Sequence, residues 1–171
     1  MIRDALFACL LLVPATVWAQ SAKPNDAQIA HIAYTAGAID IAAGQQALEK
    51  ASSSEVREFA QEMVRDHQAV NEKAVALLKK LNVTPQDNPT SQALTKAAEA
   101  KKAELSKLSG AAFDRAYIQD EVAYHKTVND TLKDQLIPNA NNAELKALLE
   151  TGLKLFQSHQ AHAERIASTL R

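Results

Sequence analysis

The 171-residue chain has only four glycines, five prolines, one cysteine and one tryptophan. So few glycines and prolines exclude a β-sandwich or β-barrel, which needs a turn about every 8 to 12 residues, and also a collagen-like or disordered chain. The formal net charge of −1 removes the main electrostatic reason to expect nucleic acid as a partner. Because 47% of the residues are apolar, the composition predicts a compact all-α domain with its own core.

The first residues have the pattern of a secretory signal peptide. A cationic start at Arg3 precedes an apolar run over residues 5–13, and the small residues that follow end at Ala19. We predict cleavage after Ala19 (signal peptide 1–19, mature domain 20–171) and an exported, periplasmic or otherwise cell-envelope protein. The alternative is a retained membrane anchor, but the apolar run is shorter than the ~20 residues that a spanning helix needs. We therefore expect no stable membrane span after cleavage.

Cleavage would also remove the only cysteine, Cys9. A mature chain without cysteine has no disulfide, no thiol nucleophile, no cysteine-ligated zinc, no iron–sulfur cluster and no c-type haem attachment. No serine lies in a strand-to-helix elbow either, so the sequence gives no support to a nucleophilic enzyme. Any metal chemistry must use His, Asp, Glu or Tyr.

The prolines after residue 20 divide the chain into blocks of helical length. Helix starts are indicated where a short polar residue precedes Glu or Gln by three positions, because the two side chains can cap backbone amides reciprocally. Such pairs are Asn25 with Gln28, Ser52 with Glu55, and Asn141 with Glu144, with Ser109 as a weaker fourth start. The predicted helices span residues 26–50, 53–81, 111–136 and 142–170. The Ala- and Lys-rich residues 91–108 predict a partly solvated connecting helix, which lets the long central link cross a bundle of two antiparallel hairpins.

One polar residue interrupts the apolar stripe near the middle of each main helix. These residues are Asp40, His67, His125 and His159. Mid-helix positions of an antiparallel bundle meet in one layer, and leaving such groups buried and unpaired would cost a few kcal/mol each. The pattern favours a shared polar or metal-binding layer, the alternative being core histidines that each bond to a neighbour. His162, one turn after His159, is expected nearer the bundle surface.

Two carboxylates extend the candidate ligand set. Glu121 precedes His125 by four residues and so shares its helical face, a spacing that can place a carboxylate and an imidazole on one metal. Asp66, next to His67 in the chain, is retained as a flanking residue. The rest of its acidic ridge, Glu58 and Glu62, is predicted to be solvated.

Three parts of the sequence resemble one protein family. They are residues 52–67 with the phrase FAQEMVRDH, residues 108–118 with the phrase LSGAAFDRAY, and the last helix with His159. Residues 27–167 are similar to an exported bacterial ferritin-like family, a domain of unknown function whose members are often labelled as membrane or outer-membrane proteins. The resemblance implies a ferritin-like antiparallel four-helix bundle with the Asp66-His67 pair, His125 and His159 at histidine-bearing positions and Asp40 at an acidic one. It implies no established reaction.

The wider ferritin superfamily builds di-iron sites from paired Glu-x-x-His motifs. No histidine here follows a glutamate by three residues, so we expect neither a ferroxidase nor a di-iron oxygenase. The favoured function is an envelope protein that binds one transition-metal ion, either Fe, Zn or Cu, because imidazole suits all three. One alternative is a structural or interaction bundle, linked to envelope stress, whose polar layer only fixes helix register. Another is haem held between two histidines. The partner classes left are a metal ion, an envelope protein and a second copy of the chain.

Overall fold

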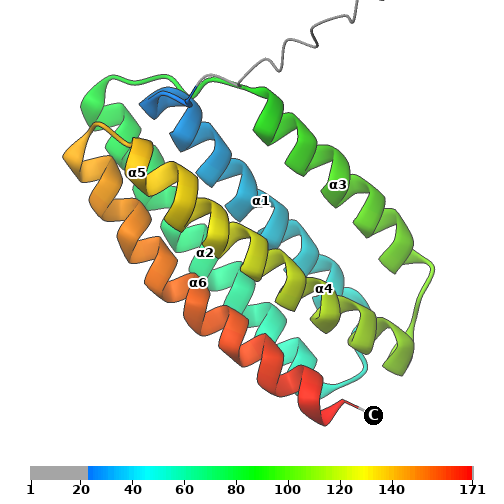
Figure 1. Ribbon diagram of the computed structural model, residues 1–171. Coiled ribbons are helices and arrows are strands. Elements are labelled where there is room, and N and C mark those ends of the chain that lie inside the picture. The colour runs from blue at the N-terminus through cyan, green and yellow to red at the C-terminus, as the bar shows by residue number, and fades with distance from the viewer. Residues whose placement is uncertain (1–22, 171) are drawn as a thin grey trace, which may run out of the picture.

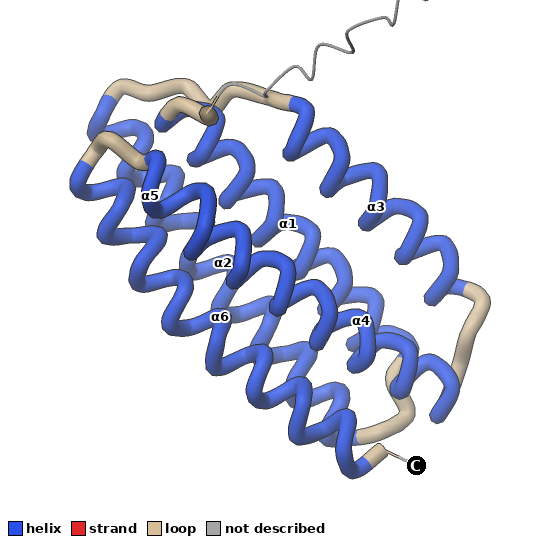
Figure 2. Tube along the Cα trace, in the orientation of Figure 1, coloured by secondary structure: helices blue, strands red, loops and turns tan. Residues whose placement is uncertain are grey.

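The computed structural model describes residues 23–170, and the predicted signal peptide lies outside them. The described residues form helices and loops without strands (Figure 2). The helices are α1 (Asp26–Lys50), α2 (Ser54–Leu81), α3 (Pro89–Ser106), α4 (Gly110–Thr131), α5 (Ile137–Asn139) and α6 (Ala143–Thr169), with a π-helical turn (Leu132–Leu136) between α4 and α5. None of these helices is both long enough and apolar enough to cross a membrane.

The four long helices α1, α2, α4 and α6 form the bundle, and α3 lies outside it beside α1 (Figure 1). The pairs α1 with α2 and α4 with α6 are hairpins, and α3 returns the chain along the length of the bundle. The predicted four-helix bundle with a long connection and an extra helix is therefore confirmed. As expected for a partly solvated helix, α3 buries only Ser91 and Leu105.

The helices α2 and α6 each begin one residue later than predicted, whereas α4 begins one residue earlier and α3 two residues earlier. The Asn25 capping box of α1 is present as predicted, but the N-caps of α2 and α6 are Ser53 and Asn142 rather than Ser52 and Asn141. The reason is tertiary, because a carboxylate from the other hairpin binds the backbone N–H groups of both residues at each start. The sequence offers two adjacent capping residues, and this contact selects the second.

The helix predicted to end at residue 136 continues beyond it. In the π-helical turn, the N–H of Ile137 donates to the carbonyl of Leu132, five residues earlier. Pro138 follows, in the short helix α5. Proline has no N–H to donate, so Pro138 cannot continue the regular hydrogen-bond pattern. The chain nevertheless stays helical through the π-helical turn, and α5 ends at Asn139.

The apolar core consists of two clusters with a polar layer between them. One contains Phe59, Phe113 and Tyr117, and the other contains Ile29 and Leu149 with their neighbours. Along each long helix, the predicted polar interruption falls between the residues of the first cluster and those of the second. The fold thus places four polar side chains in the middle of the bundle.

Candidate metal centre

The structure brings the four mid-helix residues together. Asp40 comes from α1, His67 from α2, His125 from α4 and His159 from α6, and each is at most 2% exposed. Asp40 Oδ2 lies 3.1 Å from His67 Nε2 and 3.4 Å from His125 Nε2. The ring centres of the three histidines lie 5.4 to 5.7 Å apart. Residues about 120 positions apart in sequence therefore share one buried layer.

The tautomer of His159 follows from its partner. Its Nε2 lies 3.1 Å from Asp66 Oδ2. Burial raises the pKa of Asp66, but hydrogen bonds from Arg65 and His159 outweigh this and hold it below its usual value. An ionised carboxylate only accepts, so Nε2 must carry the proton and donate. The pKa of His159 is itself lowered, mainly by burial. The neutral ring therefore keeps a lone pair on Nδ1, which is buried and has no hydrogen-bond partner.

The tautomer of His125 also follows from its hydrogen-bond partner, but here the proton lies on Nδ1. Its Nδ1 lies 3.1 Å from the backbone carbonyl oxygen of Glu121 and 3.3 Å from the Glu121 carboxyl Oε2. A backbone carbonyl can only accept, so Nδ1 is the donor. The lone pair then lies on Nε2, which is buried without a hydrogen-bond partner and faces Asp40. This contact to an outer oxygen is typical of histidines that bind metals.

His67 is the least constrained of the three by hydrogen bonds. Neither of its ring nitrogens makes one, and the 3.1 Å approach of Nε2 to Asp40 lacks the alignment that a hydrogen bond requires. Its ring stacks on Phe156 at 4.6 Å between centres and 8° between planes. Burial, followed by the charges of His125 and His159, lowers its pKa to about 2. His67 is therefore a neutral imidazole held by packing.

Two buried carboxyl groups complete the layer. Burial and then the charge of Glu121 raise the pKa of Asp40 well above its usual value. For Glu121, burial and then the charge of Asp120 raise the pKa to about 8. Both oxygens of Asp40 and Oε2 of Glu121 are buried without a well-aligned hydrogen bond, and a proton held between the two carboxyl groups is what lets them lie together. Such a pair is unfavourable when ionised unless a cation lies beside it.

The donor set fits a transition-metal ion. Ligand atoms of His67, His125 and His159 lie within 4.8 Å of one another, and so do those of Asp40, Glu121 and His125. Donors at 2.0 to 2.1 Å from a tetrahedral zinc lie about 3.4 Å from each other. The two distances from Asp40 Oδ2, 3.1 and 3.4 Å, match this spacing. Imidazole nitrogens with one carboxylate suit zinc, iron or copper.

An outer pair adjoins the layer on the α2–α6 face. His162 Nδ1 lies 2.7 Å from Glu62 Oε2, and both side chains are about 30% exposed. Glu62, Asp66 and His159 also have ligand atoms within 4.8 Å of one another. The prediction of a solvated ridge therefore agrees with the exposed Glu58 but not with Glu62, which is only partly exposed. The signal for this contact was present: Glu62 and Asp66 are one turn apart on one helix, as His159 and His162 are on another, and the two helices pack together.

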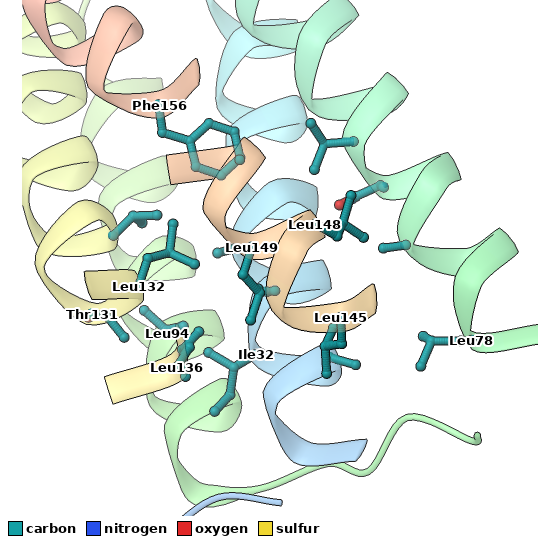
Figure 3. A pocket seen from close by; sticks show the side chains of 18 of the residues that line it. Ile32, Leu78, Leu94, Thr131, Leu132, Leu136, Leu145, Leu148, Leu149 and Phe156 are labelled. Atoms are coloured by element: carbon teal, nitrogen blue, oxygen red, sulfur yellow. The ribbon is translucent and has the colours of Figure 1, made fainter. Parts of the chain in front are cut away.

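One end of the layer is closed by apolar side chains. Phe156 lies between the histidines and a cavity of about 60 Å³ that is lined mainly by aliphatic residues. Figure 3 shows Phe156 on one side of this cavity, with Leu132, Leu145 and Leu149 among the residues around it. The resulting low-dielectric surroundings strengthen the interaction of an ion with the carboxylate of Asp40.

Comparisons with known proteins agree with the fold. A family model described as Domain of unknown function (DUF4142) matches residues 13–166. No curated protein sequence matches the chain. Among solved structures, the chain is similar to the "putative secreted protein DUF305" from Streptomyces coelicolor, with a TM-score of 0.69 and 11% sequence identity. The match covers 83% of this chain and 91% of that one. At this identity, the likeness extends to the helical-bundle fold alone.

Proposed function

The chain belongs to the DUF4142 family of domains of unknown function, and we propose that its buried histidine layer binds one transition-metal ion. The ligands are His67, His125, His159 and Asp40, and the ion is iron, zinc or copper. Asp66 and Glu121 are positioning residues that orient the rings of His159 and His125. The name of the structural neighbour and the predicted signal peptide support export, so we place this activity in the periplasm or elsewhere in the cell envelope.

One observation carries the proposal. Several buried nitrogen and oxygen atoms with lone pairs lie in one layer, and no N–H or O–H group of another residue makes a well-aligned hydrogen bond to them. His125 Nε2, His159 Nδ1 and both oxygens of Asp40 are buried and lack well-aligned hydrogen bonds. The proton of each of the two histidines is committed to an oxygen on the other side of its ring. A layer that served only to fix helix register would gain more from hydrogen bonds within itself. Lone pairs that face one another are stabilised by a cation.

Metal uptake by the purified protein tests the proposal. We expect elemental analysis and titration of chelator-treated protein to give about one equivalent of ion. His67→Ala, His125→Ala and His159→Ala should each abolish uptake. In the wild type, an ion at 100 times its Kd should stabilise the folded state by about 2.7 kcal/mol and so raise the melting temperature, and the three variants should lose this rise. His31→Ala, at a half-buried site outside the layer, is the matched control and should bind normally.

Replacing the histidines by leucine distinguishes a layer that binds metal from a layer that only packs. If the layer only fixes register, His67→Leu and His159→Leu should keep or raise stability, and the wild type should take up no ion. That pair of results would reject the metal proposal and favour the structural bundle. An intense porphyrin Soret band in the absorption spectrum of the purified protein would instead indicate haem.

A further inference from the structure

A pocket of about 660 Å³ lies beside the histidine layer, between α1, α3 and α4. Its deepest polar residues are Asp40 and Glu121, which are also part of the layer. The walls consist largely of alanines from all three helices: Ala38, Ala42, Ala43, Ala97, Ala98 and Ala123. Small side chains thus leave a hollow on the outside of the bundle that borders the proposed metal ligand Asp40, whose carboxyl group is itself covered.

The helix above the pocket is held at both ends. Near the end of α3, Gln46 Nε2 donates to the carbonyl of Lys102 at 3.2 Å. At the start of α3, Asn88 Nδ2 donates to the carbonyl of Gln28 at 3.4 Å. Between these two attachments, α3 is separated from α1 by the pocket rather than by large interlocking side chains. The pocket is therefore present while α3 is attached to α1 at both ends, and α3 does not have to move away to form it.

Carboxyl groups extend from the mouth of the pocket to its floor. Glu99 is exposed at the mouth, and Asp120 is partly buried with 27% of its side chain exposed. Asp40 and Glu121 lie at the floor, with carboxyl oxygens that are buried and lack well-aligned hydrogen bonds. Lys102 also lines the pocket, and Lys101 has its Nζ 3.6 Å from Asp120 and 3.0 Å from Glu104. An incoming cation can displace this exposed ammonium from Asp120.

The other sides of the layer are less favourable to a cation. Phe156 stacks on His67 and separates the layer from the leucine-lined cavity. On the α2–α6 face, Arg65 Nε lies 2.8 Å from Asp66 Oδ1, so an ion that approached His159 there would meet a guanidinium charge. The aromatic cluster around Phe59 and Tyr117 occupies the remaining end. Carboxylates reach the layer on two sides, with Glu62 and Asp66 beside His159 and with Asp120 beside Glu121, but on the second side they line a pocket of about 660 Å³.

We propose that the pocket under α3 is the entry site of the metal centre, where a hydrated divalent cation binds at Asp120 and passes between the alanine walls to Asp40 and Glu121. This inference rests on the proposed metal-binding function. An entry site changes how fast an ion reaches and leaves the centre, whereas the ligands determine how tightly it is held. The two roles are therefore separable in one experiment.

The test measures loading and release of Zn²⁺ by stopped flow with a chromophoric chelator, together with the equilibrium Kd. Ala98→Leu, which narrows the wall on α3, should slow loading and release by the same factor of about ten and leave Kd within about twofold. Asp120→Asn should slow loading by about tenfold at low salt and by less at high salt, because a rim charge acts on the association rate. Matched controls are Ala76→Leu, an exposed alanine of α2 outside this pocket, and Asp130→Asn, an exposed acid of α4; both should load like the wild type.

The possible outcomes test the entry site and the metal centre separately. Wild-type loading rates in both Ala98→Leu and Asp120→Asn would overturn the entry site while leaving the metal centre intact. Slower loading in Glu62→Gln alone would place entry on the α2–α6 face instead. Failure of the wild type to bind Zn²⁺, Fe²⁺ or Cu²⁺ at equilibrium would reject the proposed function itself. Asp120→Asn replaces a partly exposed side chain by one of nearly the same shape, and it keeps the test valid if Ala98→Leu is unstable.

Discussion

At the scale of single residues, the outer partners of the histidines decide which lone pairs face inward. Asp66 holds the proton of His159 on Nε2, and the carbonyl of Glu121 holds that of His125 on Nδ1. In the proposed metal centre, each of these two rings would already have the tautomer that a metal ligand requires. The preorganisation lowers the entropy lost on binding. If the layer binds metal as proposed, residues that do not touch the ion would also affect its affinity.

Asp66→Asn should lower metal affinity by about 10- to 100-fold, the usual effect of removing a carboxylate that orients a metal-binding histidine. The neutral amide accepts a weaker hydrogen bond from His159 Nε2 and no longer favours its proton there. Competition with a chelator of known affinity measures the change. Glu58→Gln, which removes an exposed acid from the same helix, should leave affinity unchanged. Equal affinities for Asp66→Asn and the wild type would show that Asp66 does not orient His159.

The stability of metal-free protein should fall as pH rises from about 7 to about 8. Glu121 has a folded pKa of about 8 against an ordinary value of 4.5, so in this range the folded state retains a proton that the unfolded state has lost. Stability therefore declines with rising pH, and the raised pKa of Asp40 acts in the same direction. His67 titrates below this range in both states. Urea unfolding in chelator measures the slope.

Glu121→Gln supplies the control for this pH dependence. The amide has nearly the same shape but no titrating proton, so the decline in stability between about pH 7 and 8 should become shallower. Metal-saturated wild-type protein should show the opposite trend to the metal-free form, because the ion replaces protons at the carboxylates and binds more tightly as pH rises. A flat profile for the metal-free wild type would contradict the buried, protonated state of Glu121.

At the scale of helices, an aspartate of each hairpin accepts hydrogen bonds from the start of the second helix of the other hairpin. Asp26 in the first turn of α1 accepts from the backbone N–H groups of Asn141 and Asn142, at 2.8 and 2.9 Å. Asp114 near the start of α4 accepts from those of Ser52 and Ser53, at 3.0 and 2.9 Å. The sequence similarity between residues 54–60 and 143–149, which open these two helices, agrees with this two-fold relation.

The two aspartates form a matched pair for mutation. Asp114 is 2% exposed, whereas Asp26 is half-buried, and both make two backbone contacts. Asp114→Ala should lower the free energy of unfolding by about 2 to 3 kcal/mol, since it removes a buried carboxylate that accepts hydrogen bonds from two backbone N–H groups and from the Ser52 hydroxyl. Asp26→Ala should cost about 1 kcal/mol, as for an ordinary helix cap. Denaturant unfolding of both variants measures the difference. Equal losses would show that burial does not strengthen this contact.

Close contact between α1 and α2 depends on Gly44. A Cβ there would lie 2.9 Å from Val64 Cγ2 and 3.1 Å from the carbonyl oxygen of Ala60, and that oxygen belongs to a helix backbone. Gly44→Ala should therefore destabilise by about 1 to 3 kcal/mol, despite the helix propensity of alanine. Gly152→Ala meets only Phe156, at 3.4 Å, and should gain up to about 1 kcal/mol. Thermal unfolding of the two variants should give shifts of opposite sign.

At the scale of the whole molecule, hydrophobic periodicity predicted the bundle and its polar layer well. Helix spans and the depth of Asp40 and the three histidines follow from local spacing, which a single sequence contains. The features that escaped prediction depend on contacts between distant segments. Ser53 rather than Ser52 caps α2 because Asp114 lies opposite, and Glu62 is half-buried because His162 faces it. The pocket under α3 depends on how a connecting helix rests on alanines.

The division of the apolar core has a consequence for how the molecule unfolds. Two clusters of buried side chains are joined through a layer of polar groups, and polar groups without partners contribute little cohesion. Without an ion, the two halves of the bundle should behave as separate cooperative units, with different amide hydrogen-exchange protection. An ion bound to residues of all four long helices would couple the two halves, so that they open together.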